Sequence, residues 1–503
     1  MSLARAAKFV LRTSAHQPSP WARTLATSSR APSKTPFLTS RRVAGITLVS
    51  GALVGAALLA PHSVLYADAD EPDGRARRNA QRTDPPLSAL IRTYVVYSLC
   101  SIPALVDYSP TILSTLLAIP GVKQITETIV RYTFFNQFVG GDSAEEALPV
   151  LEQLRAQNKG AILVYSVEVD EQTPGNTKPM PLSAHKQIVD ETLHCIDVAA
   201  DFEEKHASPN GSKGTWVAIK LPAIDAFTVD MMREYNKLPS PPKRSWFSSR
   251  KSEEAAAVSI QPLIYNTFQG YLRRTPEYLA QSIADARAGG YALGVKLVRG
   301  AYHPHEIEVH KAATASRLEA TAESPSGTHE LSISPDNMPP VWLRKDDTDS
   351  CYNSSVQMLI RLIREDVDRC TKGAPGPTIG ALFGTHNWDS ANLIVDELVK
   401  QGLATPDPSG GVWISDAAMQ RVAVSQLYGM SDALTDHMVD RTRCASPFVL
   451  KYLPYGSLAE VMPYLSRRAI ENKSVLGDGG AASERKRAAS AIMARLFGSS
   501  ESP

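Results

Sequence analysis

Cysteine is scarce in this chain, and the cysteines form no recognisable pattern. The 503 residues include five cysteines, none in a CxxC pair and none with a histidine at metal-ligand spacing. A disulfide framework or a structural zinc site would show such spacing. We therefore expect reduced structural thiols in a protein that is not secreted.

Acidic residues are missing from the start of the chain. The first is Asp68, whereas residues 1–45 contain eight lysines and arginines among many serines, threonines and alanines. This composition is typical of a mitochondrial transit peptide, which we place at 1–45. These cations outweigh the net charge of +1, so the rest of the chain is mildly acidic. A nucleic-acid-binding surface is therefore not expected.

One apolar segment, at 43–60, is barely long enough to span a bilayer. It follows Arg41 and Arg42 and is rich in glycine and alanine. Two interpretations stay open: an inner-membrane anchor or sorting segment, or a continuation of the presequence. Residues 61–86 are polar and predict a linker, and residues 477–503 a C-terminal tail.

The periodicity changes once along the main body of the chain. Residues 87–158 show helical patterns and predict an N-terminal helical region. From residue 160 to 476, short apolar runs alternate with helical patterns of 10–20 residues, as in an α/β domain with buried parallel strands. The predicted strands are 161–167, 215–221, 262–268, 291–298, 378–385, 422–429 and 448–453.

These strands predict a (β/α)₈ barrel, because polar residues cluster at their carboxyl ends, where barrels carry their chemistry. A doubly wound open sheet would also fit the alternation. No predicted strand is followed by a GxGxxG turn, which weakens that alternative.

The segment Lys451 to Asn472 combines a strand, a Pro-Tyr-Gly turn and a helix. Ser457 and Glu460 have the spacing of a capping box at the start of the helix. Helical spacing then places Tyr464, Arg468 and Glu471 on one side, with Arg467 beside them. Paired guanidinium groups suit a small carboxylate ligand. A solvated helix face is the alternative interpretation.

The segment KLVRGAY, residues 296–302, ends another strand. Strand alternation separates Lys296 and Val298 from Arg299, and Gly300 would let the backbone approach a flat ligand. A cation here would stabilise a reduced flavin ring, whereas the simpler interpretation is a strand end with basic residues reaching solvent. Three further strand ends carry polar groups that suit an anion, phosphate or adenine: Lys220, Gln269, and the trio Thr385, His386 and Asn387.

In combination, YSVE, KLVRGAY, DTDSCYN, GTHN, QLYGMSD and PYGSLAEVMPYLSRRAIEN resemble the FAD-dependent proline dehydrogenase family over about residues 87–476. The resemblance implies a distorted (β/α)₈ barrel with FAD at the carboxyl ends of the strands. It also implies oxidation of L-proline to 1-pyrroline-5-carboxylate, transfer of electrons to membrane quinone, and a location on the matrix side of the inner mitochondrial membrane.

The resemblance also implies roles for individual residues. Arg467 and Arg468 would hold the proline carboxylate, with Lys220 nearby and with Tyr302, Tyr452 and Tyr464 as walls of the ring pocket. FAD would contact Gln269, Lys296, Val298, Arg299, Gly300, Ala301, Thr385, His386, Asn387 and Glu471. Bacterial relatives have arginine at the position of Lys296, so the contact of this point charge with flavin could differ.

One strand and helix of the family are missing from the sequence near Leu221–Ile224. The family has an aspartate-bearing strand at this point, whereas here the Lys220 strand runs almost directly into a helical pattern. Seven strands would leave unpaired edges in the barrel. We expect a splice variant or gene-model error with impaired activity; the alternative is that the loop at 238–258 fills the gap. A different flavin-dependent barrel enzyme is a third interpretation.

Overall fold

The computed structural model of the protein describes residues 85–166, 182–206, 214–219, 262–320, 337–374, 376–408, 410–473 and 480–498. The predicted transit peptide, the segment at 43–60, nearly all of the linker, the loop at 238–258 and Lys220 lie outside these residues. None of the described helices is both long and apolar enough to cross a membrane.

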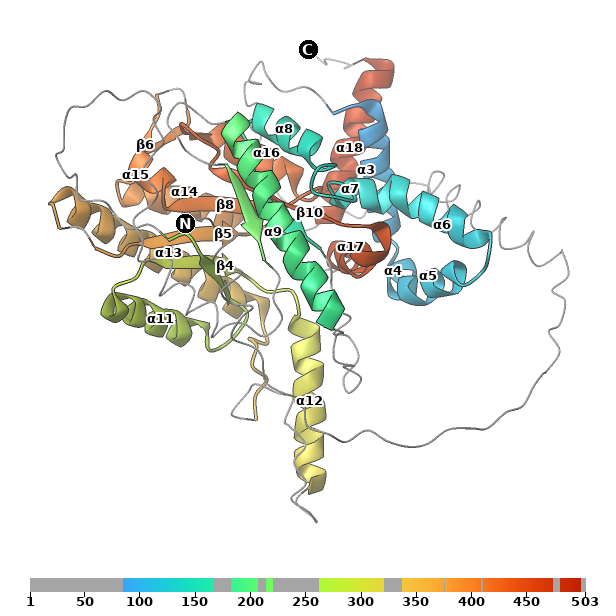
Figure 1. Cartoon of the computed structure of the whole chain (residues 1–503), viewed down its shortest axis with the longest axis horizontal. Coiled ribbons are helices and arrows are strands. Elements are labelled where there is room, and N and C mark those ends of the chain that lie inside the picture. Colours follow the sequence, from blue (N-terminus) through green and yellow to red (C-terminus); the bar gives the residue numbers. More distant parts are fainter. Residues whose placement is uncertain are drawn as a thin grey trace, which may run out of the picture. The chain divides into compact units, whose positions relative to one another are not determined.

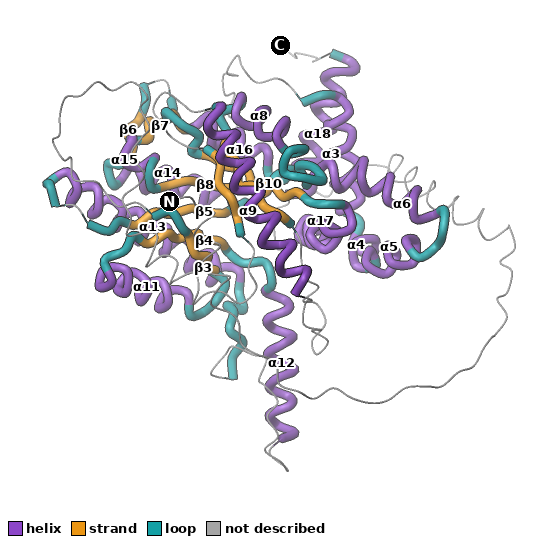
Figure 2. Tube along the Cα trace, in the orientation of Figure 1, coloured by secondary structure: helices purple, strands orange, loops and turns teal. Residues whose placement is uncertain are grey.

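Seven parallel strands form one sheet, as predicted (Figures 1 and 2). The strands are β1 (Gly160–Tyr165), β2 (Thr215–Ala218), β3 (Tyr265–Gln269), β4 (Leu293–Val298), β5 (Ile379–Gly384), β8 (Val422–Leu427) and β10 (Val449–Tyr455). Their order is β2-β1-β10-β8-β5-β4-β3, so the last strand pairs with the first. That cyclic order is the one of a barrel and excludes the doubly wound alternative.

The described strands leave one place in the cyclic order unfilled, between β2 and β3. The predicted α/β barrel is confirmed for the described residues, and the missing unit stays a prediction because residues 220–261, between β2 and β3, lie outside them. Side chains meet where the two backbones are not paired: the rings of Trp216 on β2 and Tyr265 on β3 lie 4.8 Å apart, edge to face. An edge-to-face pair of this kind is stabilising in itself.

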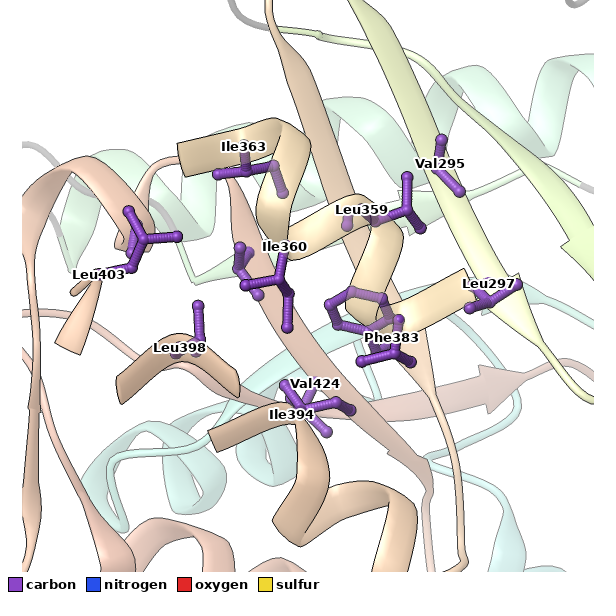
Figure 3. Close-up of a cluster of buried hydrophobic side chains, with 14 of the residues drawn as sticks. Val295, Leu297, Leu359, Ile360, Ile363, Phe383, Ile394, Leu398, Leu403 and Val424 are labelled. Atoms are coloured by element: carbon purple, nitrogen blue, oxygen red, sulfur yellow. The ribbon is translucent and has the colours of Figure 1, made fainter. Parts of the chain in front are cut away.

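Side chains alternate between the two faces of the sheet. Val295, Leu297 and Phe383 point outward into a large apolar cluster beneath the helices (Figure 3). Leu382 and Leu450 point inward and form a small plug with the rings of the inner face. The outer cluster is the main core, because it buries one side of the central strands against helices on the outside of the sheet.

Helices cover the outer face of the sheet: α8 (Leu148–Ala156), α9 (Leu182–Lys205), α11 (Thr275–Gly289), α13 (Lys345–Thr371), α14 (Trp388–Lys400) and α16 (Asp432–Arg441). α12 (His303–Ala320) extends away from the sheet (Figure 1), and α17 (Leu458–Lys473) follows β10 and packs against the N-terminal helical region. A small three-stranded sheet that the sequence did not predict contains β6 (Ala404–Pro406), β7 (Val412–Ile414) and β9 (Thr442–Arg443), with α15 (Asp416–Met419) after β7.

The N-terminal helices pack against the end of the chain. They are α3 (Leu87–Cys100), α4 (Pro103–Asp107), α5 (Ser109–Leu117), α6 (Val122–Val130), a π-helical turn (Arg131–Phe135) and α7 (Asn136–Phe138). Tyr97 and Phe138 share an apolar cluster with Val461 and Leu465 of α17. The segment expected as a C-terminal tail contains α18 (Gly480–Phe497), which lies alongside α3 (Figure 1).

Candidate active site

The start of α17 is fixed by the predicted capping residues. The Ser457 amide and hydroxyl both donate to Oε2 of Glu460, at 3.0 and 2.6 Å. The Tyr165 hydroxyl at the end of β1 donates to Oε1 of the same carboxylate, at 2.8 Å. One glutamate therefore joins the first strand to the last barrel helix and sets the direction in which α17 leaves β10.

Replacing Glu460 by alanine should destabilise the protein by about 1–3 kcal/mol, because three donors lose their acceptor. Urea unfolding would measure the change. Tyr165→Phe serves as the partial control, since it removes only one of these bonds and should cost less. Equal stability of the Glu460→Ala variant and the wild type would contradict this role.

The two arginines of α17 have different surroundings. Arg468 is 4% exposed and forms a bidentate pair with Glu471, with N···O distances of 2.6 and 2.7 Å. Its guanidinium carbon lies 4.9 Å from the ring centroid of buried Tyr464. Arg467 donates to the Tyr302 hydroxyl beyond the end of β4 and lies over that ring. A solvated helix face does not describe Arg468, because a buried guanidinium needs partners that stabilise its charge.

Lys296 and Tyr452 meet on the inner face of the sheet. The Lys296 ammonium lies 5.2 Å from the centroid of the Tyr452 ring, although β4 and β10 are separated by two strands. Gln269 and Val298 pair in register at the ends of β3 and β4, and both are half-buried. Above the apolar plug, the inner face therefore offers a cation, an aromatic ring and an amide that are not fully enclosed.

Arg299 points away from this face, as the strand alternation predicted. Each of its guanidinium nitrogens bonds to the protein: Nε to Asp349 at 2.7 Å, Nη1 to Thr385 at 2.8 Å and Nη2 to Ser390 at 2.7 Å. Although burial opposes the effect, hydrogen bonds from Lys345 and Arg299 hold the pKa of Asp349 below its ordinary value. Arg299 thus joins the ends of β4 and β5 to α13 and α14.

Gly300 has a backbone conformation that disfavours other residues, with φ at +116°. A Cβ atom at this position would lie 2.0 Å from Cδ1 of Tyr271, which is closer than any real contact. The backbone therefore requires glycine here because of the Tyr271 side chain, whereas close approach to a flat ligand stays a prediction. Ala301 and Tyr302 follow it and are exposed.

His386 is neutral and has both ring nitrogens engaged. The Leu427 amide donates to Nε2 at 3.3 Å, so the ring proton lies on Nδ1, which is 2.6 Å from the Ser431 hydroxyl. Burial, and after it the positive charges of Lys451 and Arg468, lower the pKa of His386 to about 3. Because the charge of Arg468 acts on His386, the histidine lies near Arg468 of α17.

This pKa makes stability depend on pH. Unfolded histidine takes up a proton as the pH falls through 6.5, whereas folded His386 does not do so until about pH 3. The wild type should therefore lose up to about 1.4 kcal/mol of stability per pH unit below pH 6.5 through this group. The His386→Gln variant should lose less between pH 6.5 and about pH 5 in urea titrations. Identical losses would contradict a depressed pKa.

The other two residues of the GTHN segment support the end of β5. Thr385 is buried, and its hydroxyl accepts hydrogen bonds from Arg299 and from the Asn387 amide. The Asn387 carboxamide oxygen caps α14 by accepting from the Ser390 amide at 2.8 Å. A ligand at this strand end would therefore meet a preformed network.

The site contains residues to which the sequence analysis gave no role. Asp349 and Ser390 hold Arg299, and Ser431 holds His386. Asp349 and Ser431 lie in DTDSCYN and QLYGMSD, which were recognised as distinctive segments. The two segments could therefore be found in the sequence. The sequence does not show which strand end each segment contacts.

A sequence profile described as proline dehydrogenase matches residues 222–325 and 334–478. The chain belongs to the proline dehydrogenase family. The match covers β3, β4, β5, β8, β10 and α17, and it contains every site residue that the sequence predicted except Lys220. It begins close to residues 221–224, where the sequence predicts that one unit of the barrel is missing.

Relatives of known name are similar over most of the chain. Proline dehydrogenase 1, mitochondrial, of Dictyostelium discoideum is 24% identical over 444 residues, which is 77% of this chain and 69% of that protein. Proline dehydrogenase 2, mitochondrial, of Arabidopsis thaliana is 24% identical over 453 residues, 78% of this chain and 85% of that one. Hydroxyproline dehydrogenase of Mus musculus is 22% identical over 474 residues, 81% of this chain and 91% of that one.

A solved structure that resembles this one is proline utilization A (PutA) from Bdellovibrio bacteriovorus inactivated by N-propargylglycine. The TM-score is 0.47 at 17% sequence identity, over 77% of this chain and 37% of that chain. This protein thus spans well under half of the PutA chain.

Proposed function

We propose that this protein catalyses the FAD-dependent oxidation of L-proline to 1-pyrroline-5-carboxylate. The observation that carries the proposal is the buried Arg468 guanidinium beside Tyr464, on the helix that follows the last barrel strand. Membership of the proline dehydrogenase family supplies the reaction type. Membrane quinone is the proposed electron acceptor, on the matrix side of the inner mitochondrial membrane; relatives named mitochondrial support this location.

On the substrate side, Arg468 would bind the carboxylate of the amino acid through a bidentate fork. Its present partner Glu471 occupies that fork, so substrate binding would exchange one carboxylate for another. Arg467 would add a second positive charge and hold Tyr302 over the ring of the substrate. The phenol rings of Tyr302, Tyr452 and Tyr464 would pack on its methylene groups. Lys220 would lie nearby, as the resemblance implies.

The residues at the ends of the strands fit a flavin. Lys296 supplies a cation next to an aromatic ring on the inner face, which suits a ring system that gains electrons. Gln269, Val298, Arg299, Gly300, Ala301, Thr385, His386, Asn387 and Glu471 are the proposed further contacts. When bound, FAD would supply the two-electron acceptor that no side chain can provide. Because both ring nitrogens of His386 and all three of Arg299 are engaged, these two would contribute through ring faces, backbone or shape.

A catalytically impaired protein is the second candidate, and the place that the described strands leave unfilled between β2 and β3 favours it. Backbone groups at an unpaired edge cost about 1–3 kcal/mol each if they are buried without a partner. Such a protein would keep the family signatures and yet hold flavin poorly.

Purification and reduction by substrate distinguish these candidates. The proposal predicts a yellow protein whose flavin absorption bleaches with L-proline and not with unrelated amino acids. Trans-4-hydroxy-L-proline should be tested in parallel, because some relatives are named hydroxyproline dehydrogenases. A colourless, protease-sensitive product would favour the impaired protein, and a yellow protein bleached only by another amine would point to another flavin-dependent barrel enzyme.

A further inference from the structure

The loop between β8 and α16 carries the serine that orients His386. Ser431 adopts a left-handed conformation with φ at +50°, which side-chain-bearing residues rarely adopt. In this conformation its hydroxyl lies 2.6 Å from Nδ1 of His386, and its carbonyl accepts from the Thr435 amide in the first turn of α16. Such a conformation persists when surrounding contacts determine it.

Contacts from three other elements hold this loop on its inner side. The Gly429 carbonyl accepts from the Tyr97 hydroxyl of α3 at 2.7 Å and from the Gln137 carboxamide of α7 at 3.1 Å. The Lys451 ammonium of β10 donates to the Met430 carbonyl at 2.8 Å. Lys451 is 2% exposed and also pairs with Asp432, the residue after Ser431, at 2.7 Å.

The C-terminal helix α18 completes this charge cluster from the other side. Glu484 is 5% exposed and accepts a hydrogen bond from the Ala433 amide at the start of α16. Arg487 lies 3.4 Å from Glu484, 4.0 Å from Asp432 and 3.6 Å from Asp436. The side chains of Arg487 and Asp432 are 43% and 38% exposed, and isolated pairs of this kind are weak. Their neighbours Lys451 and Glu484 are buried, and salt screens those charges less.

We propose that α18 is an intramolecular clamp for the FAD site, in which Arg487, held by Glu484, pairs with Asp432 and thereby keeps the Ser431 hydroxyl on His386. Ser431 and Arg487 are positioning residues in this proposal, which rests on the proposed function for the role of His386. α18 starts at Gly480, after the family match ends at residue 478. The clamp thus belongs to a part of the chain to which the family signatures assign nothing.

Variants of the full-length protein test the clamp through FAD affinity, measured by the quenching of flavin fluorescence. Arg487→Met and Ser431→Ala should each weaken FAD binding roughly five- to tenfold. Lys486→Met is the matched control, because it removes an exposed cation from the neighbouring position, and it should leave the affinity unchanged. Arg487→Lys should restore part of the loss.

The double variant separates positioning from general destabilisation. If Arg487 acts through Ser431, the two substitutions share one effect, and the double variant should bind FAD no more weakly than the worse single variant. The clamp would be overturned if the losses of FAD affinity in the two single variants multiplied in the double variant. Wild-type FAD affinity in Arg487→Met would also overturn it.

If the wild type binds no FAD, the proposed function fails. The clamp is then tested through the position of the ring proton on His386. Nitrogen-15 NMR of histidine-labelled protein should report the proton on Nδ1 in the wild type and a changed tautomer balance in Arg487→Met. An unchanged His386 signal in that variant would overturn the clamp.

Discussion

Arg468→Met should raise the KM for L-proline by roughly two orders of magnitude, while FAD stays bound. The guanidinium is almost fully buried, so methionine removes both the charge and the fork that a carboxylate would need. Losing one partner of a buried charge pair costs about 2–5 kcal/mol, which corresponds to this range of KM. Steady-state kinetics would give KM, and the visible flavin spectrum would show retention of the cofactor.

Two controls make this result specific to the carboxylate. Arg467→Met should have a smaller effect, because Arg467 also stacks on exposed Tyr302 and is less enclosed than Arg468. Adding Glu471→Gln to Arg468→Met removes the acid left without its partner, and KM should stay high. An unchanged KM in Arg468→Met would refute the carboxylate role of Arg468.

Gly300→Ala should destabilise the protein by about 3–5 kcal/mol or prevent its accumulation in folded form. One part of the cost is strain from the positive φ, about 1–3 kcal/mol, and the other is the overlap of the new Cβ with the Tyr271 ring. Urea unfolding or thermal unfolding would measure the loss.

The chain offers a matched control for this substitution. Gly290 ends α11 with φ at +66°, but a Cβ there would have no atom within 4 Å. Gly290→Ala should therefore cost only about 1–2 kcal/mol. Combining Gly300→Ala with Tyr271→Ala should recover the part of the stability that is lost through overlap with the Tyr271 ring. Equal costs at positions 290 and 300 would show that Tyr271 does not constrain the turn.

The sequence predicted the strands and the final helix because their signals are local. The last four residues of strand β4 alternate between buried and half-buried positions, and this alternation places Lys296 and Val298 on the face opposite to Arg299. The capping of α17 depends on Ser457 and Glu460, three residues apart. The seven strands were predictable because apolar runs can be counted, and the order of the described strands confirms the barrel.

The contacts that shape the site were not predictable, because their partners are distant along the chain. Asp349 and Ser390 meet Arg299 only after α13 and α14 have packed on the sheet. Lys451 begins the strand, turn and helix segment at 451–472, yet nothing in the neighbouring sequence shows that it is buried against Asp432. The C-terminal helix was expected as a tail, since its contacts with α3 leave little trace in its own sequence.

The hydrogen bonds of Arg299 to Asp349, Thr385 and Ser390 affect how tightly a ligand can bind at the barrel mouth. Four elements meet at one rigid planar group, so the barrel mouth takes its shape when the chain folds. A ligand that arrives later finds donors already aligned and loses little affinity to rearranging them. Lysine at this position would supply one point of attachment in place of three. The residues at the barrel mouth would then have to become ordered each time a ligand binds.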